Sequence, residues 1–319
     1  MATAPDGRGL GDRRITVTGG AGFLGRRLVA ELARRGANAP FVPRRADYDL
    51  TRPEAVDRMY ADARPEIVFH LAAVVGGIGA NQDNPGRFLH ENLVMGAHLI
   101  DGARRAEVQR FVAVGTVCAY PAEPAVPFRE ETLWDGLPEP TNAPYGLAKR
   151  LLLAQCQAYR QQYGLDAVYV IPTNLYGPGD DFDPTTSHVI PALIRKMVEA
   201  GESGATEIQC WGDGDATRDF LHVDDAAEAI CTAGIAPLGG DPVNLGSGTE
   251  VSIRELAVLI ADACGYTGRL VWDSTKPSGQ RRRVLDTSRA RERLGFVARR
   301  SLDEGLRETV RWYREHRSR

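Results

Sequence analysis

The stretch Thr18-Gly19-Gly20-Ala21-Gly22-Phe23-Leu24-Gly25 decides the fold of this 319-residue chain. It follows a β-rich run at 14–18 and precedes a helical pattern at 23–35. Its glycines permit a tight turn and let the backbone approach a pyrophosphate, while the helix N-terminus offers free N–H groups. A glycine-rich turn without a ligand is the alternative. The order of strand, turn and helix favours a dinucleotide-binding site. The residues of this loop expected to contact the cofactor are Gly19, Gly22, Phe23, Leu24 and Gly25.

Strands and helices alternate through the first half of the chain. The expected strands after the glycine loop are 41–42, 67–71, 111–114 and 167–171. The expected helices between them are 53–61, 92–105 and 145–163. This alternation indicates βαβ units with right-handed crossovers, and therefore an α/β fold with a doubly wound parallel Rossmann sheet.

The pattern loosens after Asn174, which indicates a second unit. Pro and Gly crowd residues 176–184, and helices are expected at 188–200, 253–263, 301–315 and again at 223–233. We predict a dinucleotide-binding Rossmann domain from residues 13–174 and 222–247. A smaller, discontinuous α/β substrate domain takes residues 175–221 and 248–319, and residues 1–12, polar and Gly-rich, are expected to be a disordered tail.

Composition and charge exclude several classes of protein. Hydrophobic residues make up 43% and charged residues 25%, which is ordinary for a soluble domain, and the net charge of -3 argues against a nucleic-acid surface. No apolar run approaches the roughly 20 residues that span a bilayer. The five cysteines are odd in number and form no Cys-x-x-Cys pair, which argues against a disulfide framework or a metal cluster and fits a reducing cytoplasm.

The end of the second expected strand bears on the choice of cofactor. NAD sites usually carry an acidic residue there, but this chain has Arg44 and Arg45. Two guanidiniums suit a 2′-phosphate, so NADP is favoured over NAD. The alternative is a solvated basic pair, with Asp47 or Asp49 beside the adenosine.

Other residues are expected along the cofactor. Asp49 and Leu50 are candidates for the adenine pocket. The small residues in Leu71-Ala72-Ala73 close the third strand and would let the cofactor lie against the backbone. Simple packing of helix on strand is the alternative for this segment.

Tyr145 and Lys149 stand four residues apart on an expected helix, which puts the phenol and the ammonium on one face. A nearby ammonium favours phenolate, so we expect the pKa of Tyr145 to fall toward working pH. Such a phenol exchanges a proton with a carbonyl or alcohol oxygen while hydride moves at carbon. The pair alone is also typical of a helix surface. Thr116, after the strand at 111–114, completes a set of two hydroxyls and an amine.

These features together resemble an extended short-chain dehydrogenase/reductase. Further segments resemble one family closely, GDP-L-fucose synthase, which is the GDP-4-keto-6-deoxy-mannose epimerase/reductase. The resemblance spans residues 14–296. It is carried by the segments 75–81 (VGGIGAN), 139–145 (EPTNAPY), 172–178 (PTNLYGP), 187–193 (SHVIPAL) and 211–225 (WGDGDATRDFLHVDD).

The resemblance implies a role for each matched residue. Thr116 and Tyr145 hydrogen-bond the C4 ketone, and Lys149 holds the nicotinamide ribose and lowers the pKa of Tyr145. Cys118 and His188 are the acid/base pair that inverts C3 and C5. Further cofactor contacts fall on Pro172, Asn174, Leu175 and His188. The substrate site falls on Val75, Gly76, Thr116, Asn174, Lys196, Trp211, Arg218 and Arg283.

The implied chemistry is consistent with these residue types. A hydrogen next to a ketone is acidic because the enolate spreads charge onto oxygen, and inversion needs a base on one face and an acid on the other. Cys and His both titrate near neutrality. The pair of hydroxyls and the cationic Lys149 would stabilise the developing oxyanion.

Two departures from the family keep alternatives open. Ala21 stands where the family often has a basic residue, which weakens the preference for NADP. Thr116 replaces the usual Ser, and its methyl group faces the sugar. The alternatives are an epimerase without net reduction, an enzyme acting on another nucleotide sugar such as a heptose, and a non-catalytic Rossmann cofactor sensor. A homodimer through the helix of Tyr145 is also expected, from Leu151, Leu152, Leu153 and Gln155, although core packing explains these residues nearly as well.

Overall fold

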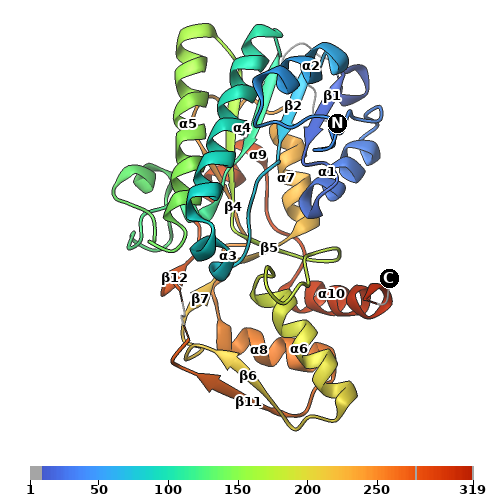
Figure 1. Cartoon of the computed structure of the whole chain (residues 1–319), viewed down its shortest axis with the longest axis vertical. Helices are drawn as coiled ribbons and strands as arrows, with labels where there is room; N and C mark the ends of the chain where they lie inside the picture. Colours follow the sequence, from blue (N-terminus) through green and yellow to red (C-terminus); the bar gives the residue numbers. More distant parts are fainter. Residues whose placement is uncertain (1–8, 277–278, 318–319) are drawn as a thin grey trace.

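A parallel sheet of five strands forms the centre of the computed structural model, which describes residues 9–276 and 279–317. The strands are β1 (Ile15–Thr18), β2 (Ile67–His70), β3 (Arg110–Val114), β4 (Ala167–Pro172) and β9 (Val243–Leu245). They lie in the order β1-β2-β3-β4-β9, and every neighbouring pair is parallel. Figure 1 labels β1, β2 and β4 of this sheet, with helices beside it. The predicted α/β fold with a parallel Rossmann sheet is confirmed.

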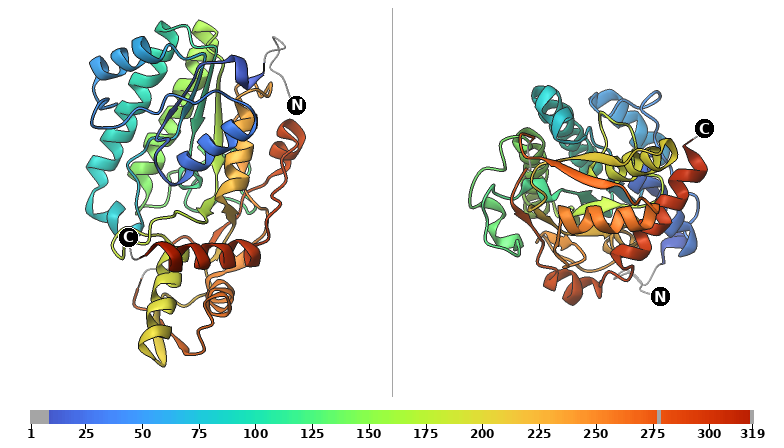
Figure 2. Two further views of the ribbon diagram at one scale, coloured as in Figure 1. Left: turned by 90° about the vertical axis from the view of Figure 1, so that its right-hand side faces the viewer. Right: turned by 90° about the horizontal axis from the view of Figure 1, so that it is seen from below.

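Helices cover both faces of this sheet. Side chains alternate along each strand, so Phe111 and Ala113 of β3 face one hydrophobic core while Val112 and Val114 face the other. One layer holds α2 (Pro53–Ala63), α4 (Pro85–Arg105) and α5 (Ala143–Tyr163). The opposite layer holds α1 (Phe23–Arg34), α7 (Val223–Ala233) and α9 (Ser288–Leu294) (Figure 2). The described residues also form the short 3-10 helices η1 (Leu10–Asp12), η2 (Val117–Ala119) and η3 (Glu130–Trp134).

The strand predicted at 41–42 is reduced to one bridge. Phe41 N donates to Ile15 O at 2.8 Å, and Val17 N donates to Phe41 O at 2.9 Å. Pro40 and Pro43 stand on either side and have no N–H, so the ladder ends there. The bridge still places Phe41 on the side of β1 away from β2, and the chain therefore reverses its winding at β1.

The remaining elements surround a third hydrophobic core. Its helices are α6 (Val189–Ser203), α8 (Ile253–Cys264) and α10 (Leu302–His316), and α3 (Ile78–Asp83) precedes α4. Its small sheets pair β5 (Asn174–Tyr176) with β8 (Phe220–His222), β6 (Glu207–Trp211) with β11 (Arg269–Asp273), and β7 (Thr217–Arg218) with both β10 (Val251–Ser252) and β12 (Arg282–Arg283). The predicted domain boundaries stay a prediction.

The segment before β1 is only partly a tail. Residues 1–8 of the predicted tail lie outside the described residues. Leu10–Asp12 form the turn η1, and Leu10 is 5% exposed within the core beside α1. The prediction of disorder is wrong for this turn because burial of the leucine side chain offsets the entropy of ordering it.

The helix that carries Tyr145 contributes mainly to the core. Leu152 and Leu153 are buried there, while Leu151 is 47% exposed. Core packing therefore explains two of the three leucines that suggested a dimer interface. Within the described ranges, we find no helix with the length and apolar character needed to cross a membrane.

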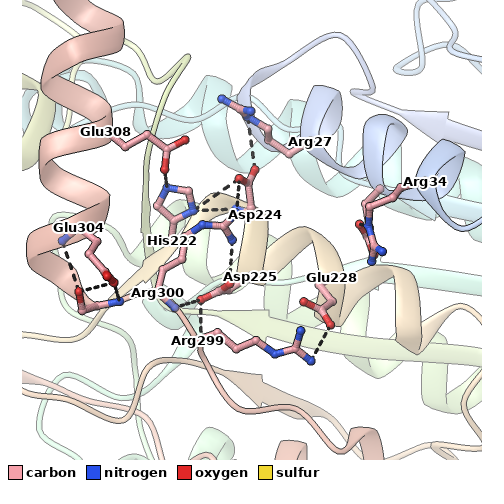
Figure 3. A network of polar contacts seen from close by, with 12 residues as sticks. Arg27, Arg34, His222, Asp224, Asp225, Glu228, Arg299, Arg300, Glu304 and Glu308 are labelled. Carbon is pink, nitrogen blue, oxygen red and sulfur yellow. Dashed lines mark hydrogen bonds and ion pairs between the residues drawn. The ribbon is translucent and has the colours of Figure 1, made fainter.

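A polar network fastens α10 to the junction of β8 and α7 (Figure 3). The Asp225 carboxylate accepts the backbone N–H and the guanidinium of Arg300, both at 3.0 Å. His222 Nδ1 accepts the N–H of Asp224 at 3.2 Å, so its proton belongs on Nε2, which lies 3.6 Å from Glu308. In that tautomer the lone pair of Nδ1 is used by the Asp224 N–H and Nε2 carries the proton, so the ring has no lone pair left for a metal ion. Burial lowers the pKa of His222, which favours the neutral ring. The network therefore holds β8, the strand that follows Arg218, in place.

Candidate active site

The carboxyl ends of the parallel strands meet at one edge of the sheet, and most predicted site residues follow these ends. The glycine loop follows β1, Thr116 follows β3, and Asn174 begins β5 just after β4. Ligands of open parallel sheets bind at this edge, close to the point where the winding reverses. The topology therefore brings the predicted cofactor loop and the predicted hydroxyl pair to the same edge.

The glycine loop has the geometry of a phosphate cradle. Gly19 has a φ of 73°, and a Cβ there would lie 2.7 Å from Ala72 N, so only glycine fits. Gly22 is exposed and caps α1 without a side chain, which leaves the first N–H groups of the helix, on Phe23 and Leu24, with no acceptor inside the helix. These groups fit the pyrophosphate of a dinucleotide.

The two arginines after Phe41 differ in their surroundings. Arg44 is exposed, and its side chain makes no ion pair within the part of the chain that the structure describes. Arg45 is exposed but pairs with Glu91 at 3.3 Å. Asp49 accepts the N–H of Thr51 at 3.1 Å and its hydroxyl at 2.7 Å, so its carboxylate is committed to its own turn. Of these two arginines, Arg44 is therefore the one without an ion pair to any described residue.

The other predicted cofactor residues lie along the sheet edge. Leu71 N donates to Thr18 O at 3.1 Å, which keeps the strand end close to the glycine loop. Leu50 is 8% exposed and belongs to the core. Leu71, Ala72, Ala73, Asn174 and Leu175 are half-buried, and Pro172 is buried.

Tyr145 and Lys149 enter the site from the buried face of α5. The side chain of Thr116 lies beside the Tyr145 phenol. The Lys149 ammonium donates to Val114 O at 3.0 Å, and burial lowers its pKa to about 8. Burial lowers the pKa of His70, and Lys149 lowers it further; His70 Nδ1 lies 2.9 Å from the Thr18 hydroxyl. The amine thus reaches the end of β3.

The expectation that Lys149 lowers the pKa of Tyr145 is wrong in this structure. Burial raises the pKa of Tyr145 well above its usual value, the nearby Cys118 raises it further, and the Thr116 side chain only partly opposes them. Spacing on a helix fixes the face of a side chain but not where its end points, and Lys149 points at a sheet carbonyl. The phenol therefore stays protonated at neutral pH, which suits a proton donor.

Cys118 lies on the turn η2, which α5 holds in place. Its N–H donates to the Thr116 hydroxyl at 3.2 Å. Arg150, beside Lys149, donates to Ala119 O at 3.0 Å. Gly146 allows the close approach, since a Cβ there would lie 2.2 Å from Cys118 O. The helix that carries the phenol thus also positions the thiol.

Two buried guanidiniums lie beside this thiol. Arg283 Nη1 donates to Cys118 Sγ at 3.7 Å. Arg218 donates to Thr217 O at 2.7 Å, and burial together with Arg283 lowers its pKa to about 9. Arg283 is 8% exposed and Arg218 is 9% exposed. A concentration of positive charge here suits a diphosphate.

His188 is the residue before the first turn of α6 and lies near the same group of charges. The pKa of His188 is lowered mainly because the surrounding protein displaces water from the ring. Arg283 lowers it further, and Asp181 raises it. The residue as a whole is exposed to solvent. Gly77 N donates to Thr186 O at 3.0 Å, which brings the predicted segment at Val75 and Gly76 beside this residue.

Trp211 lies between two lysines at the far end of the site. It is 55% exposed, with Lys196 Nζ at 5.9 Å and Lys276 Nζ at 5.8 Å from its ring centre. Arg195 is committed to Glu199 at 2.8 Å, so Lys196 is the residue that reaches the ring. The sequence motifs did not identify Lys276 as a site residue. The basic run at 281–283, which follows it closely, was the only indication that this segment lies near the site. Asn174 donates to the backbone oxygen of Asp219 at 2.9 Å, next to Arg218.

Comparison with known proteins adds a family to this geometry. A profile of the NAD dependent epimerase/dehydratase family matches residues 15–246. The chain is 42% identical over 304 residues to the probable GDP-L-fucose synthase 1 of Oryza sativa subsp. japonica, covering 95% of this chain and 92% of that protein. It is 37% identical over 317 residues to the GDP-L-fucose synthase of Escherichia coli K12, covering 96% and 98%. A GDP-L-fucose synthetase from Naegleria fowleri bound to NADP superposes with a TM-score of 0.88 at 28% identity, covering 96% and 95%.

Proposed function

Because this chain belongs to the GDP-L-fucose synthase family, within the NAD dependent epimerase/dehydratase family, we propose that it makes GDP-L-fucose from GDP-4-keto-6-deoxy-D-mannose. The reaction inverts C3 and C5 of the keto sugar and then reduces C4. One observation carries the proposal beyond family membership. The side chains of Thr116 and Tyr145 lie beside each other, and Cys118, a thiol suited to proton transfer, lies on the turn that follows Thr116.

The proposed roles divide into two stages that share one ketone oxygen. Thr116 and Tyr145 donate hydrogen bonds to the C4 oxygen, which stabilises the enolate during inversion. Cys118 and His188 remove and return protons at the neighbouring carbons. For the second stage, NADPH supplies the hydride when bound, and Tyr145 gives its proton to the oxygen. Lys149 holds the nicotinamide ribose, and the arginines beside Cys118 bind the diphosphate.

A direct experiment combines NADPH with GDP-4-keto-6-deoxy-D-mannose in heavy water and identifies the products by NMR. We expect NADPH oxidation and deuterium at C3 and C5 of GDP-L-fucose. Deuterium without NADPH oxidation would replace the proposal with an epimerase. If the purified chain bound NADPH but turned over neither this sugar nor a GDP-heptose ketone, the sensor interpretation would stand instead.

The preference for NADP rests on Arg44 in our proposal. The change Arg44→Ala should raise the Kd for NADPH by about 10- to 100-fold, since a charge-assisted hydrogen bond to phosphate contributes roughly 1.5–3 kcal/mol. The Kd for NADH should change little, because NADH has no 2′-phosphate. Fluorescence titration measures both constants. Arg45→Ala should have a smaller effect because Glu91 already pairs with Arg45. Equal losses for both cofactors would contradict the role of Arg44.

The protonation of Lys149 should be visible in the pH profile of turnover. Burial lowers its pKa to about 8, so the cation is present below that pH and is lost above it. We expect kcat/KM, which reports groups of the free enzyme, to fall above about pH 8. In Lys149→Arg the guanidinium stays charged, so a slower enzyme should lose this alkaline fall. The same fall in both proteins would assign it to another group.

We also propose a homodimer in which α5 faces its copy. Leu151 and Tyr163 are 47% and 48% exposed on this helix, which leaves apolar surface for a partner. Light scattering measures the mass in solution. Leu151→Lys should shift a dimer toward monomer, and an unchanged mass would place the contact elsewhere.

A further inference from the structure

Arg283 makes a side-chain contact with the sulfur of Cys118 that family membership does not explain. The two residues lie 165 positions apart in sequence, and Arg283 Nη1 donates to Cys118 Sγ at 3.7 Å. Arg283 is 8% exposed, so bulk water screens its charge poorly. A diphosphate-binding arginine needs no bond to a thiol. The contact therefore points to a second role in the proton-transfer step.

The guanidinium is held in this position by several bonds. Arg283 Nε donates to Gln280 Oε1 at 3.2 Å. Gln280 Nε2 donates in turn to Ala122 O at 2.7 Å, close after the turn that carries Cys118. The backbone of Arg283 is fixed on β12, where its carbonyl accepts the N–H of Asp219 at 2.9 Å. A cation anchored at both ends does not adjust freely to the sugar.

We propose that Arg283 is a positioning residue that orients the Cys118 sulfur and favours its thiolate, the form that accepts a proton. The inference rests on the proposed function, in which Cys118 exchanges a proton with the sugar. A thiolate is the nucleophilic and basic form of cysteine, and a hydrogen bond donated to a charged group favours that charge. Donation from a buried cation is stronger than donation from a neutral group.

The other groups that face Cys118 do not replace Arg283. Tyr145 approaches from α5 as a protonated, neutral phenol. Arg218 acts on the thiol through its charge, and its Nη1 donates to Thr217 O. His188, which Arg283 also influences, is exposed to water. Of these groups, only Arg283 donates directly to the sulfur, so its removal should have the largest effect on the thiol.

The test measures the rate of alkylation of the full-length protein by iodoacetamide across pH, without nucleotide. Cys118 is half-buried and the other four cysteines are buried, so it is the accessible thiol. In Arg283→Met the midpoint of the profile should rise by about one pH unit, and the rate at pH 7 should fall about tenfold. Arg283→Lys keeps a cation and should restore most of the rate.

Two matched variants serve as controls. Arg281→Gln removes an exposed arginine two residues away and should leave the profile unchanged. Cys118→Ser should abolish the fast alkylation, which assigns the signal. If Arg283→Met does not fold, Gln280→Leu tests the same contact by releasing the guanidinium from its anchor, and it should raise the midpoint by a smaller amount.

Different results would contradict the role of Arg283 and the proposed substrate. A profile that is identical in the parent and in both Arg283→Met and Gln280→Leu overturns the role of Arg283, whatever reaction the enzyme performs. A shifted profile in a protein that does not turn over the keto sugar would support the contact and refute the substrate. An equal shift in Arg218→Gln would replace the direct bond with a general effect of charge.

Discussion

Replacing Tyr145 by phenylalanine should lower kcat for reduction of the C4 ketone by about 10²–10⁴-fold, the usual contribution of a positioned proton donor. The variant keeps the ring that packs at 7% exposure and removes only the hydroxyl. Burial raises the pKa of this phenol, so the parent enzyme holds a proton there throughout the neutral range. Absorbance of NADPH measures the loss directly.

The same variant should separate catalysis from binding. Fluorescence titration should give an almost unchanged Kd for NADPH, because the glycine loop, Arg44 and Lys149 remain. Deuterium exchange at C3 and C5 should also slow, but by a smaller factor, since the Thr116 hydroxyl still donates to the ketone oxygen. If kcat for reduction fell less than about tenfold, below the usual range for such a donor, Tyr145 would not be the proton donor.

The long strands and helices were predictable because each is a buried repeat of apolar residues. Strands β1 to β4 read as short hydrophobic runs, and every residue in them is buried. Strands such as β7 and β12 hold two residues each, which is too few to show a period of two. Prolines on both sides of Phe41 ended a strand that its apolar character alone had suggested.

The motifs predicted the residues of the site, and their roles stay predictions. The structure places Thr116 beside Tyr145, as a shared contact with one ketone oxygen requires. The direction of the pKa shift of Tyr145 was wrong, because helix spacing gives no information about the carbonyl that Lys149 reaches. The bond from Arg283 to Cys118 joins residues 165 positions apart. Such contacts depend on how β12 packs beside η2, and no local pattern encodes that packing.

Replacing Cys118 by serine should separate the two stages of the proposed reaction. Serine keeps the size and the hydrogen-bonding position, but its hydroxyl does not ionise near neutral pH and makes a poor base. We expect deuterium exchange at the carbons beside the ketone to fall by about 10²–10⁴-fold. Reduction of the uninverted ketone should continue, since Thr116, Tyr145 and Lys149 are unchanged. NMR of the product in heavy water reports both outcomes.

The product of that variant decides the role of the thiol. A reduced sugar that keeps the original configuration at C3 and C5 is expected, and it would show that hydride transfer does not need the thiol. His188→Gln is the matched control because it removes the other proposed proton carrier without touching η2, so it should slow exchange while the Cys118 alkylation profile stays that of the parent. If exchange and inversion survived unchanged in Cys118→Ser, the acid/base role would pass to His188 and a water molecule, and the bond from Arg283 would serve only to pack the turn.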